Sequence, residues 1–162
     1  MIYRRRPVTA GVTPFKPHMD LAARQSLMEW IDSFSGSFES EIAVPLQMYF
    51  AGNDEEHCSL TVNTVGCPSS EHVHQSLKTL LEYSDTHDVL IRFTDYDDAT
   101  IDDDVWVSSD TAWVVTKASP EQIEDRIGHL QPSTVHEQTI DSSFLNFPEV
   151  PSGYKVVAVW WD

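Results

Sequence analysis

Two strand-like runs joined by an acidic connection make up residues 88–119, which read DVLIRFTDYDDATIDDDVWVSSDTAWVVTKAS. The runs, 89–93 and 112–116, are rich in the β-branched and aromatic residues that favour strands. The connection between them contains no lysine or arginine and seven aspartates: Asp95, Asp97, Asp98, Asp102, Asp103, Asp104 and Asp110. We therefore expect a small α+β domain arranged around an acidic hairpin.

The length of 162 residues predicts one folded domain. Hydrophobic residues make up 41% of the chain, and five Trp and seven Phe provide large side chains for a core. Residues 1–18 differ from the rest, because they contain three prolines, no hydrophobic periodicity and the triplet Arg4, Arg5 and Arg6. The sequence thus predicts a flexible basic arm over residues 1–18 and a single α+β domain over residues 19–162.

The net charge of −16 is unevenly distributed, since half of the ten basic residues lie in the first 24 positions. The acidic remainder repels phosphate backbones and anionic membranes, so we expect neither a nucleic-acid nor a membrane partner. The sequence has no secretory signal and no apolar run near the ~20 residues of a membrane helix. Its two cysteines, Cys58 and Cys67, are expected to be free thiols, which favours a cytoplasmic location.

Hydrophobic periodicity and capping residues predict the other elements. We expect helices at 20–34, at 44–50, from Ser69 or Ser70 to about 83, and from Ser119 to about 130. We expect strands at 57–64, 88–93, 111–117 and 154–161, with a further short strand possible at 134–137. From residue 57 onward this order, β-α-β-β-α-β, predicts a ferredoxin-like two-layer sandwich with the helix at 20–34 added to it.

Aromatic residues give two further expectations. Trp160 and Trp161 are adjacent in a strand, so one ring should face the helices and the other the open face of the sheet. Phe144, Leu145 and Phe147 are expected to fix a loop at 139–153 to the body of the domain.

Motifs for catalysis, cofactor binding or metal binding are not found in the sequence. There is no G-x-S-x-G, C-x-x-C or H-x-x-x-H motif, and the six glycines do not form a phosphate-binding loop. The aspartate series departs from an EF-hand loop, because Ala99 stands where a ligand belongs and Thr100 stands where the loop needs glycine. We therefore expect no catalytic residue, no cofactor and no metal, and a core position for Cys58.

The charge pattern favours a protein-binding role. We expect an acidic domain that neutralises a basic protein partner, as an immunity or inhibitor protein does. Its partner-binding residues would be six aspartates that steer association and a tryptophan that acts as exposed anchor, namely Asp95, Asp97, Asp98, Asp102, Asp103, Asp104 and Trp106.

Two alternatives stay open. The first is an enzyme or small-ligand binder with its site between the sheet and the N-terminal helix. The second is a homo-oligomer, such as a homodimer, that buries the open face of its sheet through Trp160 or Trp161.

Three segments carry a resemblance to known sequences: VPLQMYFAGND at 44–54, SDTAWVVTKASPEQIEDRIGHLQPSTVHE at 109–137 and VVAVWWD at 156–162. Their combination of GND, SDT, SPE, LQP and WWD resembles a group of small acidic bacterial proteins that is common in actinobacteria. The resemblance implies membership of an uncharacterised family. It implies no activity, so it carries no functional residue over to this chain.

Overall fold

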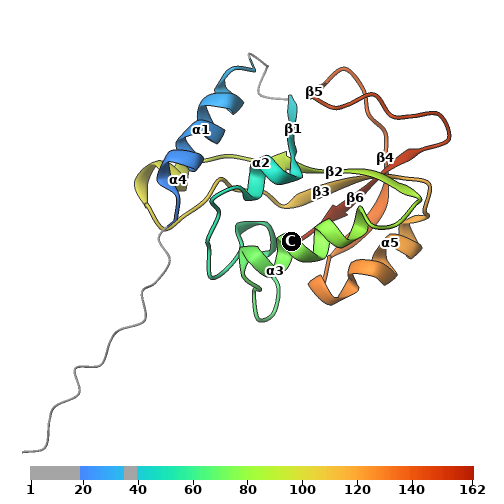
Figure 1. Ribbon diagram of the computed structural model, residues 1–162, viewed down its shortest axis with the longest axis horizontal. Helices are drawn as coiled ribbons and strands as arrows, with labels where there is room; N and C mark the ends of the chain where they lie inside the picture. Colours follow the sequence, from blue (N-terminus) through green and yellow to red (C-terminus); the bar gives the residue numbers. More distant parts are fainter. Residues whose placement is uncertain (1–18, 35–39) are drawn as a thin grey trace, which may run out of the picture.

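The computed structural model describes residues 19–34 and 40–162, and the predicted arm at 1–18 lies outside them. A six-stranded sheet forms the centre of the molecule (Figure 1). Its strands are β1 (Glu41–Pro45), β2 (Thr86–Phe93), β3 (Thr111–Thr116), β4 (Thr134–Gln138), β5 (Phe144–Leu145) and β6 (Lys155–Trp160). They lie in the order β4-β6-β3-β2-β1-β5, and every neighbouring pair is antiparallel except β1 and β5.

Five α-helices and two 3₁₀ helices accompany the sheet in the described residues. They are α1 (Leu21–Asp32), α2 (Leu46–Phe50), α3 (Ser70–Leu80), α4 (Asp97–Ile101), α5 (Pro120–Ile127), η1 (Ser59–Thr61) and η2 (Gly128–Leu130). The predicted caps are confirmed, because Asp20, Ser69 and Ser119 each accept a backbone N–H in the first turn of the following helix. No helix in residues 19–34 or 40–162 is long and apolar enough to cross a membrane.

The two faces of the sheet are covered differently. Helices α3 and α5 pack on one face, while the segment 139–153 lies on the other side of the sheet (Figure 1). This segment must cross that face, since it leaves β4 at one edge and reaches β5 at the opposite edge before returning to β6. We call the face under residues 139–153 the open face, because it carries no helix.

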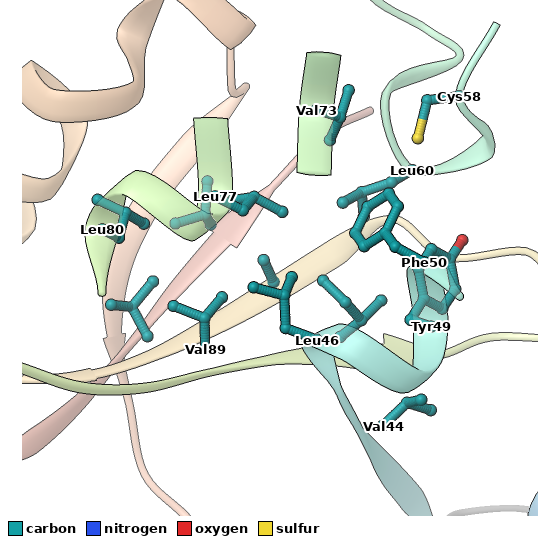
Figure 2. Close-up of a cluster of buried hydrophobic side chains, with 14 of the residues drawn as sticks. Val44, Leu46, Tyr49, Phe50, Cys58, Leu60, Val73, Leu77, Leu80 and Val89 are labelled. Atoms are coloured by element: carbon teal, nitrogen blue, oxygen red, sulfur yellow. The ribbon is translucent and has the colours of Figure 1, made fainter. Parts of the chain in front are cut away.

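The main core lies between the sheet and the helices. Figure 2 shows part of it, in which α2, η1 with the residue before it, α3 and the strands contribute Val44, Leu46, Tyr49, Phe50, Cys58, Leu60, Val73, Leu77, Leu80 and Val89. A second, smaller cluster on the open face contains Trp113 and Val115, and Phe144 and Phe147 of the crossing segment pack on it. The two phenylalanine rings stand 5.3 and 5.5 Å from the Trp113 ring, so the expectation that they fix this loop is confirmed.

The two adjacent tryptophans divide between the faces as predicted. Trp161 belongs to the main core and donates its indole N–H to the carbonyl of Leu130 at 2.8 Å. Trp160 is half-buried and lines a cavity on the open face. The alternation of side chains between the two faces of the sheet therefore continues from β6 to Trp161.

The predicted strand at 57–64 is wrong. These residues form η1 and a turn, and Val62 is 58% exposed where a strand would have buried it. The backbone N–H of Ser59 donates to the carboxylate of Glu55 instead of to a neighbouring strand. The strand before α3 is β1, in which three consecutive residues are buried, so the alternation that marks a half-buried strand is missing.

The α+β class is confirmed, whereas the ferredoxin-like order is not. The two strands that flank α2 and α3 are β1 and β2, and they are antiparallel neighbours. A βαβ unit would make them parallel. The helix-covered sheet is therefore built from the meander β1-β2-β3, extended by β6 and β4 on one side and by β5 on the other.

Candidate functional site

The aspartates predicted to bind a partner lie in the connection between β2 and β3. We call residues 95–104 the acidic segment. It begins with a backbone pairing between Asp95 and Ser108, continues into α4 and ends in a turn in which the carboxylate of Asp102 accepts the N–H of Asp104. All six of its aspartates are exposed, so the structure brings them together on one ordered, solvent-facing segment.

The acidic segment is attached to α1 by Arg24. Its side chain is 8% exposed, and Nη1 donates to the carbonyls of Asp102, at 2.9 Å, and Val105. Nη2 donates to the carboxylate of Asp103 at 3.2 Å, although that carboxylate is 81% exposed. The guanidinium therefore binds the backbone at the end of the segment from inside, and the carboxylate that it contacts, that of Asp103, stays largely exposed.

Sequence reasoning missed this role of Arg24. The residue belongs to the buried side of α1, together with Leu27 and Ile31. An arginine in line with the apolar positions of a helix is the signal that could have found it, because a buried guanidinium needs acceptors.

Trp106 is not an exposed anchor, and that expectation is wrong. The side chain is fully buried, its indole N–H donates to the carbonyl of Tyr49 at 2.8 Å, and its backbone N–H donates to the carboxylate of Glu55 at 3.1 Å. The chain thus turns inward immediately after the acidic segment. The exposed apolar side chain on the segment is Ile101, which closes α4 and is 85% exposed.

A buried polar cluster around Glu55 supports this inward turn. The carboxylate accepts the backbone N–H and the hydroxyl of Ser59 as well as the N–H of Trp106, and the hydroxyl of Ser70 lies 3.4 Å away. Burial raises the pKa of the neighbouring Cys58 to about 12, so this side chain stays a neutral thiol at physiological pH. The cluster joins the start of α3 to the end of the acidic segment, and nothing in it provides an activated nucleophile.

A cavity of about 240 Å³ lies on the open face. Its polar lining consists of Glu41, Arg92, Thr111, His136 and Gln138, and its apolar lining of Trp113, Phe144, Ala158 and Trp160. An adjoining cavity of about 380 Å³ shares Gln138 and extends along β4 and β6. Both lie on the face opposite the helices, so neither is the predicted site between the sheet and the N-terminal helix, which stays a prediction.

Two charged side chains, Glu41 and Arg92, line the smaller cavity, and Asp110, which is not a lining residue, also binds Arg92. Nε and Nη2 of Arg92 donate to the two carboxylate oxygens of Glu41, at 2.5 and 3.1 Å. Nη1 of the same residue donates to Asp110 at 3.3 Å, and Asp110 also accepts the hydroxyl of Thr111 at 2.7 Å. Three of the five guanidinium N–H groups are therefore occupied by two carboxylates.

The sequence of β6 creates the hollow. Ala158 is the open-face residue between Val156 and Trp160, and it pairs with Trp113 of β3 on one side and His136 of β4 on the other. A methyl group surrounded by larger side chains leaves a depression with a floor at Ala158. No group of three or more His, Cys, Asp or Glu side chains in the described part of the chain is placed to hold a metal ion.

Comparisons with known proteins identify relatives of this chain. The model of the "Uncharacterized protein YfbO family" matches residues 22–159. "Uncharacterized protein YfbO" of Escherichia coli (strain K12) is 27% identical over 118 residues, which cover 72% of this chain and 80% of that protein. No solved structure matches the chain.

Proposed function

The chain belongs to the Uncharacterized protein YfbO family, and we propose that it binds a basic protein through its acidic segment. The family description names no activity, so the proposal rests on the residues themselves. The observation that carries it is a set of six exposed aspartates within ten residues, on a segment whose backbone is fixed by Arg24. An ordered segment loses less conformational entropy on binding than a free loop does.

The electrostatics support a cationic partner. The chain carries a net charge of −16, and Asp103 is the one aspartate of the acidic segment with an ion pair among the described residues. The other five carboxylates are available to attract lysine and arginine side chains. Such a surface raises the association rate more than the final affinity, and its effect weakens as salt increases.

The apolar contact in this proposal is made by Ile101 in place of Trp106. Its side chain is 85% exposed and lies within the acidic segment, with Asp98 and Asp102 as close neighbours in the sequence. Apolar groups at the centre of a charged patch are buried on binding, while the surrounding charges form the rim. Ile101 therefore replaces Trp106 as the proposed centre of the contact.

The concrete form that we propose is neutralisation of a basic protein, in the manner of an immunity or inhibitor protein. Six carboxylates placed on the cationic surface of a toxin or nuclease would block its approach to phosphate groups. The proposed location is the cytoplasm, in keeping with the two free thiols. The five-part pattern from GND to WWD, and its occurrence in actinobacteria, stay predictions about this family.

Charge-matched variants test the proposal. One variant replaces Asp97, Asp98, Asp102 and Asp104 with Asn and keeps Asp103, which pairs with Arg24. The control replaces four exposed acids elsewhere with their amides: Glu82, Glu124, Asp125 and Glu149. Both variants change the net charge from −16 to −12. Each is used, beside the natural chain, to capture proteins from the host lysate at low and high salt.

We expect the natural chain and the control to capture the same basic protein, and the acidic-segment variant to lose it. Capture by the natural chain should decrease at high salt because the steering charges are screened. Equal capture by the acidic-segment variant and the control would contradict the proposal, since only the total charge would then matter.

A further inference from the structure

We propose that the smaller cavity on the open face binds a small organic cation, specifically a primary amine with an apolar or aromatic body. This site is separate from the acidic segment. It combines a carboxylate-bearing wall at one end with an aromatic wall at the other, and the two ends select for different parts of one molecule.

The charge at the first end favours a cation. Glu41 and Asp110 surround Arg92, so two negative charges stand against one positive charge. The two carboxylate side chains are 28% and 35% exposed, and each keeps acceptor capacity that Arg92 does not use. An ammonium group in the cavity can therefore bind beside Glu41, which lines it, whereas an anionic ligand would meet a local charge of the same sign.

The second end provides an apolar surface. Trp160 stands across the cavity from Arg92, because its strand β6 and strand β2 are separated by β3. Two strand spacings separate the strands of Arg92 and Trp160 by about 10 Å, and Glu41 reaches Arg92 from β1, one strand further along the sheet. Trp160 is half-buried and has no aromatic or cationic partner among the described residues, unlike Trp113, which contacts Phe144 and Phe147. Its indole can cover the apolar body of a ligand.

The floor and the size restrict the ligand further. Thr111 lies between Arg92 and Trp160, and Ala158 next to Trp160 on β6 offers only a methyl group, so a ring or a short aliphatic chain can lie flat on β6 there. A volume of about 240 Å³ is below the usual range for drug-sized ligands, about 300–1,000 Å³. The cavity thus suits a compact molecule whose amine reaches the carboxylates while its body rests on Trp160 and Ala158.

Three probes of similar shape and different charge test this inference: 2-phenylethylamine, 2-phenylethanol and phenylacetate. Each is titrated into the full chain, and binding is followed by backbone and indole ¹H–¹⁵N chemical shifts. We expect the amine to bind at least about fivefold more tightly than the alcohol, and phenylacetate to bind most weakly. The shifts should concentrate at Ala158, Thr111 and the indole of Trp160.

Substitutions in the chain distinguish the effect of the Glu41 charge from the effect of the shape of the cavity. Glu41→Gln keeps the side-chain volume and should weaken amine binding about fivefold while leaving the alcohol unchanged. Glu124→Gln on α5 removes the same charge from the helix side of the molecule and should change neither. Ala158→Leu should fill the floor and abolish binding of both probes, and an unchanged fold of this variant is checked by its other chemical shifts.

Three patterns of probe binding would overturn the inference. They are equal or tighter binding of the alcohol, preferential binding of phenylacetate, and amine-induced shifts that lie in residues 95–104 instead of the cavity. Absence of binding by all three probes at millimolar concentration would do the same.

A lysine side chain of a docked protein has the same chemistry as a free amine. If Ala158→Leu also abolishes capture of the basic protein, the amine comes from that protein, and if capture is unchanged it comes from a free molecule.

Discussion

Replacing Arg24 with Met is expected to release the acidic segment. Met keeps an unbranched stem in α1, so the packing beside Leu27 is retained while the guanidinium is lost. The two carbonyls that Arg24 binds, those of Asp102 and Val105, then lose a charged donor. Hydrogen bonds to a charged group contribute about 1.5–3 kcal/mol each. Because both carbonyls lie near the surface and can bind water instead, we expect a loss of about 3 kcal/mol for the pair.

The ion pair with Asp103 should contribute little of this loss. Its carboxylate is 81% exposed, and exposed ion pairs are worth about 0.2–1 kcal/mol. Asp103→Asn therefore serves as the companion variant, with an expected loss below about 0.5 kcal/mol. The backbone hydrogen bonds, and not the salt bridge, should thus account for the effect of Arg24.

Urea unfolding measures both variants. A loss of about 3 kcal/mol should lower the unfolding midpoint of Arg24→Met by about 1–2 M. Hydrogen exchange should accelerate at residues 102–106 before it changes in the sheet. A loss below about 1 kcal/mol for Arg24→Met, or an equal loss for Asp103→Asn, would refute the proposed role of the backbone hydrogen bonds.

Three further predictions concern other parts of the molecule. Gly52→Ala should lower the free energy of unfolding, measured by thermal unfolding, by at least about 2 kcal/mol. Gly52 has φ +80°, and an added Cβ would lie 2.7 Å from the Cβ of the α1 N-cap residue. A loss below about 0.5 kcal/mol would show that Gly52 and α1 are not in tight contact. Hydrogen bonds from Arg126 lower the pKa of Asp85, so this pair stabilises the fold above the ordinary carboxyl pKa and the contribution disappears as pH falls through the lowered value. When the pH is lowered below about 4, the Asp85→Asn variant should therefore lose less stability than the natural chain loses. Parallel plots of unfolding free energy against pH for the two proteins would contradict this. At pH 8 an aromatic disulfide reagent should label the partly exposed Cys67 before the buried Cys58, which should react only on unfolding, whereas equal rates would argue against the buried thiol.

Local signals made much of the fold predictable. Ser119, Pro120 and Gln122 supply a cap, a first-turn proline and a capping box within four residues, so α5 begins where the sequence indicates. The strands β3 and β6 were predicted from dense runs of valine and tryptophan, with small errors at their ends. These elements depend on neighbours in the sequence, which a single sequence contains.

Other features depend on residues that are distant in the sequence. Trp106 is buried because its two N–H groups find acceptors at Glu55 and Tyr49, 51 and 57 residues away. The alternation at 57–64 suggested a strand, yet Glu55 binds Ser59 and turns the chain. No local pattern reports such contacts.

The candidate sites were predictable to different degrees. The six aspartates of the acidic segment could be identified from their clustering in the sequence alone. The cavity on the open face could not, because it is assembled from β1, β2, β3, β4, β6 and the crossing segment. Its floor is a single alanine, which carries no chemical signal until its neighbours across the sheet are known.

We propose that the acidic segment is the contact surface of this protein. Hydrogen–deuterium exchange of the chain, with and without the basic protein that it captures, tests this most directly. We expect slower exchange at residues 95–104 in the complex and unchanged exchange in α5, which carries exposed acids of its own. Protection confined to α5 or to the open face, with residues 95–104 exchanging as in the free chain, would contradict it.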